Sequence, residues 1–362
     1  GLVSSELYKI EDILRGAIRD SVFPGAVATV IKDGVMVYRQ EMGYHDYEKI
    51  KQVKDSDVFD LASITKVVST TTAVMKLIDD GKLALNDEIW RFLPEFNSEE
   101  KRHIPIRDML LHQSGLPAFR VYVDEFKDRN SIIKAIKNEP LIYKTGTEYV
   151  YSDLGMILLA EIVSLITDRG IDAYMRREFY YPMGMYGAYF NPKRVSRWYV
   201  NRIPPTEIDT VYRDHLIQAD VHDERAFYMD GVAGHAGLFA TADDLAKYST
   251  MILNDGIYDG RRYLSSKIIR EFTSQQSSIS GRGLGFDRKS PTGFTTAGQL
   301  SSNDTFGHTG FTGTSFWIDR EKNMAVMLLT NRTFPYRSYG KEISKIRAAV
   351  ADAAFSAFIK TQ

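Results

Sequence analysis

The stretch Phe59-Asp-Leu-Ala-Ser63-Ile-Thr-Lys66 opens the most informative segment of this 362-residue chain. Apolar residues then recur at helical spacing, at Val67, Val68, Val74, Met75, Leu77 and Ile78. This periodicity predicts a helix that begins near Ser63 and ends near Asp80, with Gly81 as its C-cap. Because residues three apart share a helix face, we expect the Lys66 amine to reach the Ser63 hydroxyl.

A serine and a lysine one helical turn apart can perform nucleophilic chemistry. A serine hydroxyl is a weak nucleophile until a neighbouring base takes its proton. A lysine desolvated in an apolar pocket could hold a lowered pKa and act as that base, or help another base to act. A helix N-terminus adds a positive dipole end and free N–H groups where an oxyanion would form. Since this spacing is common by chance, the pair alone is weak evidence for catalysis.

The composition of the chain excludes several classes of function. Lysine and arginine (46) nearly balance aspartate and glutamate (47), and the net charge of −1 predicts no nucleic-acid partner. The absence of cysteine excludes thiol catalysis, disulfides and cysteine metal sites. No run approaches the ~18 uninterrupted apolar residues of a membrane span, so we expect no transmembrane segment.

The order of helical and extended patterns predicts an α+β fold. An Asp33-Gly34 pair between two apolar runs is the signal of a β-hairpin. We expect helices at 5–20, 131–137, 154–167, 242–253 and 341–359, strands at 25–31, 35–39, 313–318 and 324–330, and a long wrapping loop at 190–230.

These elements predict a single domain over residues 1–362. The two ends of the chain can complete one antiparallel sheet of about five or more strands, flanked by N- and C-terminal helices, with a mostly helical region inserted between them. We expect the sheet lobe at approximately residues 1–60 and 240–362, and the mostly helical lobe at approximately residues 61–239.

A second polar motif, Tyr149-Val-Tyr151-Ser-Asp153, stands just before an apolar helical run. This spacing could place a phenol and a carboxylate at the lip of a cleft. A phenolate near the Lys66 ammonium would be a usable base. Considered alone, the pattern more often marks a solvent-facing aromatic residue before an Asp N-cap.

A third motif, Gly307-His308-Thr309-Gly310-Phe311-Thr312-Gly313, precedes an expected strand. Glycine lets a strand backbone approach a ligand closely, and backbone N–H groups there can complete an oxyanion hole. Without other motifs, a glycine-rich turn that feeds a hairpin is the simpler interpretation. It is not a phosphate loop, because no Gly-Lys-Ser/Thr follows and the segment does not open a helix.

The three motifs in this order resemble those of the serine β-lactamase and penicillin-binding-protein superfamily. The most similar subgroup comprises class C β-lactamases, D-alanyl-D-alanine carboxypeptidases and esterases. Further similar stretches make the resemblance cover nearly the whole chain, and they lie at 106–116, 181–185, 232–239 and 308–331.

The resemblance implies a serine hydrolase of β-lactamase/transpeptidase-like fold, with a role for each matching residue. Ser63 would be the acylated nucleophile and Lys66 its activating partner. Tyr151 would be the general base, although the sequence leaves open whether Lys66 or Tyr151 takes the proton. The backbone N–H groups of Ser63 and Phe311 would form the oxyanion hole. Substrate-binding positions would be Asp153, His308, Thr309, Gly310 and Phe311.

Two positions depart from the superfamily pattern. The middle motif usually ends in Asn, which donates and accepts, whereas an ionised Asp153 only accepts. The last motif often begins with Lys, whereas His308 is neutral much of the time near pH 7. Both changes weaken the case for capture of anionic β-lactams or a free peptide C-terminus. We therefore expect acyl-enzyme chemistry on cell-wall-derived D-amino-acid peptides or esters, with weak or absent β-lactamase activity.

The sequence also contains features that occur in other classes of protein. A metal hydrolase would use His222, Asp223 and His235, but no H-E-x-x-H spacing is present, so we expect no metal and no cofactor. Ser114 lacks the G-x-S-x-G context of an α/β-hydrolase. A penicillin-binding or sensor protein that acylates without turnover is the principal alternative.

The resemblance also implies a location and a kind of partner. We expect an extracytoplasmic, periplasmic enzyme whose partner is a small-molecule or peptide substrate. The chain begins at Gly1, with neither an initiator methionine nor a signal peptide. It is therefore expected to be part of a longer precursor or fusion.

Overall fold

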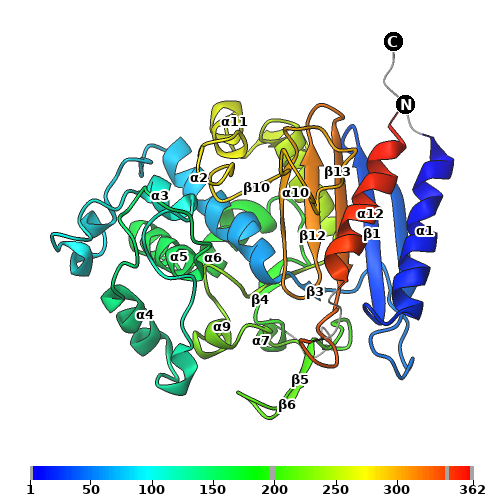
Figure 1. The fold of residues 1–362 in the computed structure, drawn as a ribbon, viewed down its shortest axis with the longest axis horizontal. Helices are drawn as coiled ribbons and strands as arrows, with labels where there is room; N and C mark the ends of the chain where they lie inside the picture. Colours follow the sequence, from blue (N-terminus) through cyan, green and yellow to red (C-terminus); the bar gives the residue numbers. More distant parts are fainter. Residues whose placement is uncertain (1–2, 196–199, 339–341, 359–362) are drawn as a thin grey trace.

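The central sheet joins the two ends of the chain. The computed structural model describes residues 3–195, 200–338 and 342–358. Six antiparallel strands lie in the order β10-β11-β12-β13-β1-β2 (Figure 1). Their bounds are Gly25–Lys32 (β1), Val35–Gly43 (β2), Asp287–Arg288 (β10), Phe306–Thr309 (β11), Ser315–Asp319 (β12) and Met324–Thr330 (β13).

Early and late strands pair at the middle of this sheet. β1 runs antiparallel to β13 from Ala26 opposite Thr330 to Lys32 opposite Met324. The β1–β2 turn has positive φ at Asp33 (53°) and Gly34 (76°), the backbone that an Asp-Gly hairpin turn requires. The predicted hairpin, the strand at 324–330 and the antiparallel α+β architecture are therefore confirmed.

Both faces of the sheet are covered by helices. Strand side chains alternate between faces, so Ala26, Ala28 and Val30 of β1 pack with α1 (Ser4–Arg19) and α12 (Ile343–Ser356). Val27 and Ile31 point the other way into the larger core, and α10 (Ala242–Leu253) also contacts β1 and β13. Figure 1 shows α1 and α12 side by side against the outer face of the sheet.

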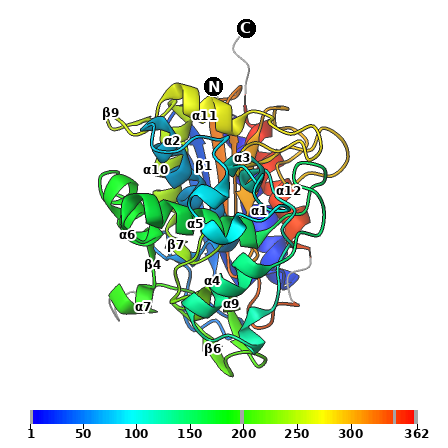
Figure 2. The same cartoon turned by 90° about the vertical axis from the view of Figure 1, so that its left-hand side faces the viewer.

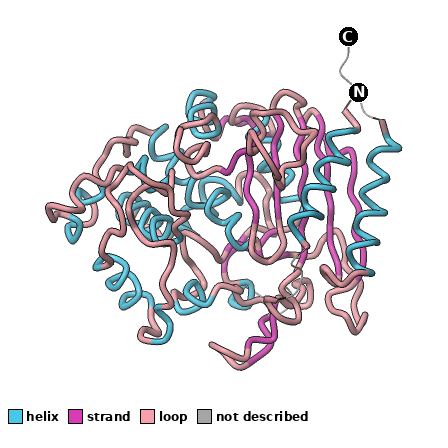
Figure 3. The backbone as a smooth tube through the Cα atoms, in the orientation of Figure 1, coloured by secondary structure: helices cyan, strands magenta, loops and turns pink. Residues whose placement is uncertain are grey.

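The region between the first and last strands is mostly helix and loop (Figure 3). Its α-helices are α2 (Thr72–Asp79), α3 (Ile106–Leu110), α4 (Arg129–Asn138), α5 (Asp153–Thr167), α6 (Ile171–Met175), α7 (Pro192–Val195), α9 (Glu224–Tyr228) and α11 (Ser266–Thr273). Short 3₁₀ or π turns are η1 (Ala62–Ile64), η2 (Lys66–Thr71), η3 (Ile89–Arg91), η4 (Pro94–Phe96), η5 (Tyr122–Asp124) and η6 (Arg176–Tyr180).

Small additional sheets connect this helical region to the central one. β3 (Phe59–Asp60), β7 (Leu238–Ala240) and β4 (Tyr189–Phe190) form a three-stranded sheet. Two hairpins, β5 (Glu207–Asp209) with β6 (His215–Ile217) and β8 (Ile257–Tyr258) with β9 (Arg261–Arg262), stand apart from it. In Figure 2, turned by 90°, the helical region faces the viewer in front of the sheet.

Several predicted elements match and others need correction. The helix at 242–253 is found with the same bounds, and its N-cap Thr241 forms a capping box with Asp244. The predicted loop at 190–230 contains short elements as well, and residues 196–199 lie outside the described ones. The last helix is described as Ile343–Ser356, and both predicted ends, residues 341 and 359, lie outside the described ranges.

The predicted helix from Ser63 to Asp80 is not a uniform α-helix. Ser63 lies in the 3₁₀ turn η1, Lys66–Thr71 form a π-helical turn, and α-helix begins only at Thr72. Every residue of the π turn is buried, so tertiary packing rather than local propensity sets this backbone. π turns inside helices are frequent at functional sites.

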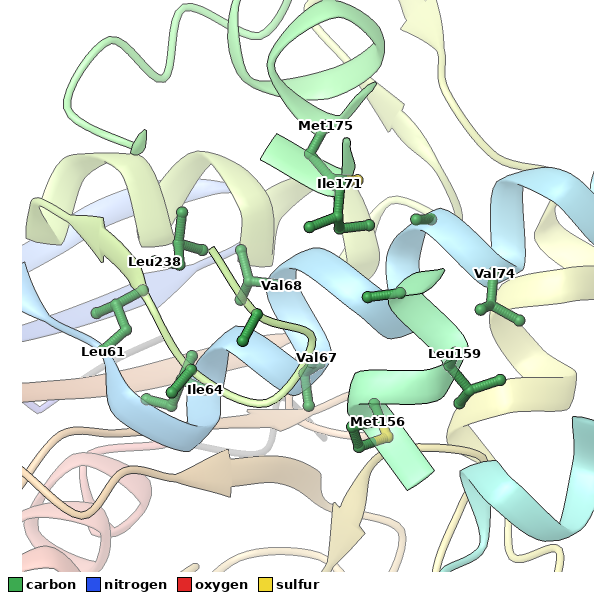
Figure 4. Close-up of a cluster of buried hydrophobic side chains, with 14 of the residues drawn as sticks. Leu61, Ile64, Val67, Val68, Val74, Met156, Leu159, Ile171, Met175 and Leu238 are labelled. Carbon is green, nitrogen blue, oxygen red and sulfur yellow. The ribbon is translucent and has the colours of Figure 1, made fainter. Parts of the chain in front are cut away.

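This segment runs through the centre of the larger core. Figure 4 shows Val67, Val68 and Val74 packed among side chains of other elements, including Leu159 of α5 and Met175 of α6. All five are fully buried. Within the described ranges no helix is long and apolar enough to cross a membrane.

Truncation of a core leucine should destabilise the fold. Leu159 is fully buried, so we expect Leu159→Ala to lower the free energy of unfolding by ~3 kcal/mol. Leu165, on the same helix, is 60% exposed, and Leu165→Ala should change the free energy of unfolding by less than ~0.5 kcal/mol. Urea denaturation measures both, and equal losses would contradict the packing described for α5.

Candidate active site

A strained turn presents Ser63 to the cleft. The preceding residue, Ala62, has φ of +47°, a left-handed conformation that is uncommon outside glycine. The buried Asp60 carboxylate holds this turn, because it accepts hydrogen bonds from the backbone N–H of Ala62 (2.8 Å) and of His222 (2.7 Å). Strain of this kind persists only where the surroundings fix it, as Asp60 does here.

The Lys66 amine lies against the Ser63 hydroxyl, as predicted. Lys66 Nζ donates to Ser63 Oγ at 2.8 Å and to the backbone carbonyl of His235 at 3.2 Å. It also forms an ion pair with Asp153 Oδ1 at 2.8 Å. These three acceptors match the three N–H groups of a protonated amine.

The neighbours of Lys66 determine its charge state. Burial would lower the pKa of this fully buried lysine, but the Asp153 carboxylate and the Tyr151 phenol outweigh burial and raise its pKa above the ordinary value. Of the two roles that the sequence left open for Lys66, a raised pKa favours assistance to another base. The sequence could not distinguish these roles, because nothing along the chain shows that Asp153 is in direct contact with Lys66.

Tyr151 lies beside this pair and among two histidines. Its ring centroid is 5.0 Å from Lys66 Nζ, 4.6 Å from the ring of His112 and 6.0 Å from that of His308. Ser152 caps α5 by accepting from the N–H of Gly155, which fixes the backbone next to Tyr151. Burial lowers the pKa of both histidines well below the usual value, and nearby cations add to the effect. Both imidazoles are therefore neutral near pH 7.

Ser63 opens onto a cleft of about 510 Å³. The predicted site residues Tyr151, His308, Thr309, Gly310 and Phe311 line it, whereas Lys66 and Asp153 are absent from its lining and Lys66 is fully buried. The remaining lining residues are Tyr149, Arg282, Asp287, Arg332, Ile343, Ser344 and Arg347. A larger cavity of about 670 Å³ lies by α6 and β4, but no predicted site residue lines it.

The turn after β11 is bound directly to the Ser63 segment. Thr312 Oγ1 donates to the Asp60 carbonyl (2.7 Å) and Thr314 Oγ1 donates to the Leu61 carbonyl (3.1 Å). A Cβ on Gly310 would come within 2.5 Å of the Leu61 carbonyl oxygen. The glycine that the motif contains is thus required by the close approach of two backbones.

Arg347, from the terminal helix α12, supports the same turn from behind. Its buried guanidinium donates to the backbone carbonyls of Gly310, Gly313 and Thr314. Burial lowers the pKa of Arg347 to about 9, and the nearby Arg332 adds to the effect. Sequence reasoning did not single out this residue, because its helical position alone looks like an ordinary charged surface position.

Arg282 is a second cation that the sequence analysis missed. It is 5% exposed and lines the cleft, with its guanidinium carbon 5.8 Å from the centre of the Tyr151 ring. Nη1 contacts Asp287 at 3.2 Å, whereas Nε and Nη2 are buried without a hydrogen-bond partner among the described residues. Unpaired buried donors beside a cleft can receive a ligand.

Asp153 belongs to a chain of alternating charges. Its second oxygen contacts Arg225 Nη2 at 2.6 Å, and the same nitrogen contacts Asp223 at 2.8 Å. Asp223 in turn contacts His235 Nε2 at 2.8 Å. Burial would raise the pKa of Asp153, but Lys66 and Arg225 outweigh burial and hold the pKa well below its usual range. Asp153 is therefore ionised.

The same cluster could be mistaken for a metal centre. One ligand atom each of Asp153, Asp223 and His235 lies within 4.8 Å of the others. The Arg225 guanidinium bridges both carboxylates and already supplies the positive charge that a metal would bring. We therefore describe these residues as an ion-pair network.

Comparisons with known proteins identify the family. The family model described as Beta-lactamase matches residues 10–351, and the chain belongs to this family of serine hydrolases. An N-acetylmuramyl-L-alanine amidase of Bacillus subtilis (strain 168) is 33% identical, over 96% of this chain and 90% of that protein. A putative D-alanyl-D-alanine carboxypeptidase of Escherichia coli O157:H7 is also 33% identical, over 86% of this chain and 79% of that protein.

Solved structures confirm the fold. A class C β-lactamase superposes with a TM-score of 0.78 at 17% identity, covering 99% of this chain and 98% of that one. At this identity the likeness is evidence for the fold alone. The β-lactamase-like fold and the superfamily predicted from the three motifs are confirmed.

Enlarging Gly310 should disturb the site without unfolding the protein. Gly310→Ala would push β11 away from the Ser63 segment, and we expect kcat/KM for an ester substrate to fall by about 100-fold. Gly16→Ala is the control, since a Cβ there meets only the Arg19 side chain at 3.9 Å. It should leave activity unchanged and stabilise α1 by up to ~1 kcal/mol. Full activity in Gly310→Ala would contradict the close approach.

Proposed function

We propose that this protein is a serine acyl hydrolase that works through an acyl-enzyme at Ser63 and acts on cell-wall-derived peptides or esters. The observation that carries this proposal is the 2.8 Å contact between Lys66 Nζ and Ser63 Oγ at the edge of an open cleft. Membership of the β-lactamase family supports it.

The contacts favour Tyr151 as the group that takes the serine proton. Lys66 is held as an ammonium by Asp153, so it has no free lone pair with which to accept a proton. In the proposed step, Tyr151 starts as the phenolate and takes the Ser63 proton to become the phenol, while Ser63 Oγ bonds to the substrate carbonyl carbon. The Lys66 ammonium lies 5.0 Å from the Tyr151 ring centre and stabilises negative charge on it.

The remaining steps follow from the same groups. The backbone N–H groups of Ser63 and Phe311 would stabilise the oxyanion of the tetrahedral intermediate. Tyr151 then returns its proton to the leaving group as the carbonyl–leaving-group bond breaks. In deacylation Tyr151 takes a proton from water, the hydroxyl oxygen bonds to the acyl carbon, and the proton returns to Ser63 Oγ as the ester bond breaks.

The cleft favours a substrate with a carboxylate. The presence of His308 in place of a lysine predicted poor anion capture, and burial keeps His308 neutral by lowering its pKa. The structure contains another cation at this place, because Arg282 and His308 line the same cleft. A peptide that ends in D-Ala-D-Ala carries a carboxylate one residue from its scissile bond. This matches the name of the carboxypeptidase relative.

A second candidate substrate comes from the amidase relative. That protein is named an N-acetylmuramyl-L-alanine amidase, and the match covers 96% of the length of this chain. An amidase of this kind would release an L-alanine-linked peptide from muramic acid, whereas a carboxypeptidase would release free D-alanine. Incubation with a muramyl pentapeptide, followed by chromatography of the products, distinguishes the two activities.

Removal of the Ser63 hydroxyl should abolish acylation. After incubation with a p-nitrophenyl ester or a penicillin, we expect an intact-mass increase in the wild type and none in Ser63→Ala. Ester turnover should fall by at least ~10³-fold, as for other serine nucleophiles. Ser114→Ala serves as the control, since Ser114 is not part of the cleft lining. Equal turnover by wild type and Ser63→Ala would show that the nucleophile is another residue.

The same experiment distinguishes a hydrolase from a sensor. Release of one equivalent of p-nitrophenol followed by no further release would indicate a protein that acylates without turnover. Sustained release is expected from a hydrolase.

Neutralising Arg282 should affect only substrates with a carboxylate. We expect Arg282→Gln to lower kcat/KM for a D-Ala-D-Ala peptide by about 10- to 100-fold, the loss of one charge-assisted hydrogen bond. The C-terminally amidated peptide and a neutral p-nitrophenyl ester should be affected less than about threefold. Arg261→Gln, at an exposed position away from the cleft, is the control. Equal losses for all substrates would show that Arg282 is structural.

A further inference from the structure

Position 153, one of the two at which this chain departs from the superfamily pattern, lies in contact with two cations. Residue 153 is an aspartate, and both of its oxygens are occupied by cations: Oδ1 by Lys66 at 2.8 Å and Oδ2 by Arg225 at 2.6 Å. An ionised carboxylate without a free oxygen is poorly suited to bind a substrate amide. Asp153 instead contacts the Lys66 amine, which donates a hydrogen bond to Ser63.

Arg225 balances the charge of this carboxylate and of a second one, Asp223. It lies on α9, whose N-cap Asp223 accepts from the Ala226 N–H, so the acid and the helix position each other. Arg225 is 7% exposed, and its Nε and Nη1 have no hydrogen-bond partner among the described residues. A buried guanidinium is costly to desolvate and persists here because two carboxylates face it.

We propose that Asp153 and Arg225 function as one interdependent ion pair that orients the Lys66 ammonium toward Ser63, with Arg225 acting as a positioning residue through Asp153. The proposal rests on the proposed hydrolase function. Two cations, Lys66 and Arg225, alternate with two carboxylates, Asp153 and Asp223, so the four charges sum to zero. Removing either member of the pair leaves an uncompensated charge buried beside Lys66, whereas removing both restores the balance.

The polar and titratable groups around Lys66 come from several elements. They are Tyr151 and Asp153 at the start of α5, His112 after α3, His308 of β11, the His235 carbonyl before β7, and Ser63 itself. His112 and His308 are neutral near pH 7, because burial lowers their pKa. Asp153 is therefore the permanent negative charge in contact with the ammonium.

The test is a double-mutant cycle of Asp153→Asn, Arg225→Met and the combined variant. We expect each single variant to lower kcat/KM for a p-nitrophenyl ester by about 100-fold, and the double variant to lose no more than either single one. The urea concentration at the midpoint of unfolding should fall in each single variant and should fall no further in the double variant. The exposed pair Glu11–Arg15 supplies the control cycle, Glu11→Gln with Arg15→Met, in which neither variant should change activity.

The pH profile provides a readout that a purely structural role would not move. In Asp153→Asn, Lys66 no longer contacts a carboxylate, whereas burial and the Arg225 cation remain. The pKa of Lys66 therefore falls. The alkaline limb of the kcat/KM profile should then shift to lower pH by at least about one unit. In the double variant, the loss of the Arg225 cation should return the limb part of the way upward. Arg225→Met alone should not move it downward.

Three outcomes would overturn the proposal, and each is distinct. Additive effects on both activity and the urea midpoint would show that the two residues are independent. Coupling in the urea midpoint alone would make Arg225 a structural residue. An alkaline limb unchanged in Asp153→Asn would show that Asp153 does not control Lys66. A failure of the hydrolase proposal itself appears separately, as undiminished ester turnover in Ser63→Ala.

Discussion

A lysine ammonium buried behind a serine is the charge on which the rest of the site depends. Water cannot solvate Lys66, so its three N–H groups need acceptors from the protein, and they find them in Ser63, Asp153 and the His235 carbonyl. The carboxylate that neutralises Lys66 needs a further cation, which Arg225 supplies, and Arg225 needs Asp223. One buried charge thus determines the identity of residues on three separate elements.

The fold makes this arrangement rigid by connecting the Ser63 turn to the sheet. Asp60 fixes the strained backbone at Ala62 on one side, and Thr312 with Thr314 anchors the β11–β12 turn to the same segment. Arg347 reaches that turn from the terminal helix. Because β1 and β13 pair at the middle of the sheet, both ends of the chain contribute to the position of the backbone that follows β11.

The sequence predicted what depends on local pattern and missed what depends on contact through space. Periodicity and turn chemistry located the β1–β2 hairpin and the helix at 242–253, and the order of three motifs identified the superfamily. The π turn after Ser63 was missed because packing sets it. Arg225 and Arg282 were missed because no local pattern marks either arginine. The partner of Arg225, Asp153, and the partner of Arg282, Tyr151, are both remote along the chain.

Two of the arginines that the sequence did not reveal, Arg225 and Arg282, lie in different surroundings. Around Asp153, the positive charges of Lys66 and Arg225 alternate with the negative charges of Asp153 and Asp223. These four charges sum to zero, so together they contribute little to the electrostatic potential in the cleft. By contrast, Arg282, Arg332 and Arg347 line the cleft and Asp287 is the single carboxylate among its described lining residues. Positively charged side chains thus outnumber carboxylates among the described lining residues of the cleft. In the proposed function, Arg282, which comes from a different loop, supplies the cation that a lysine at position 308 would supply.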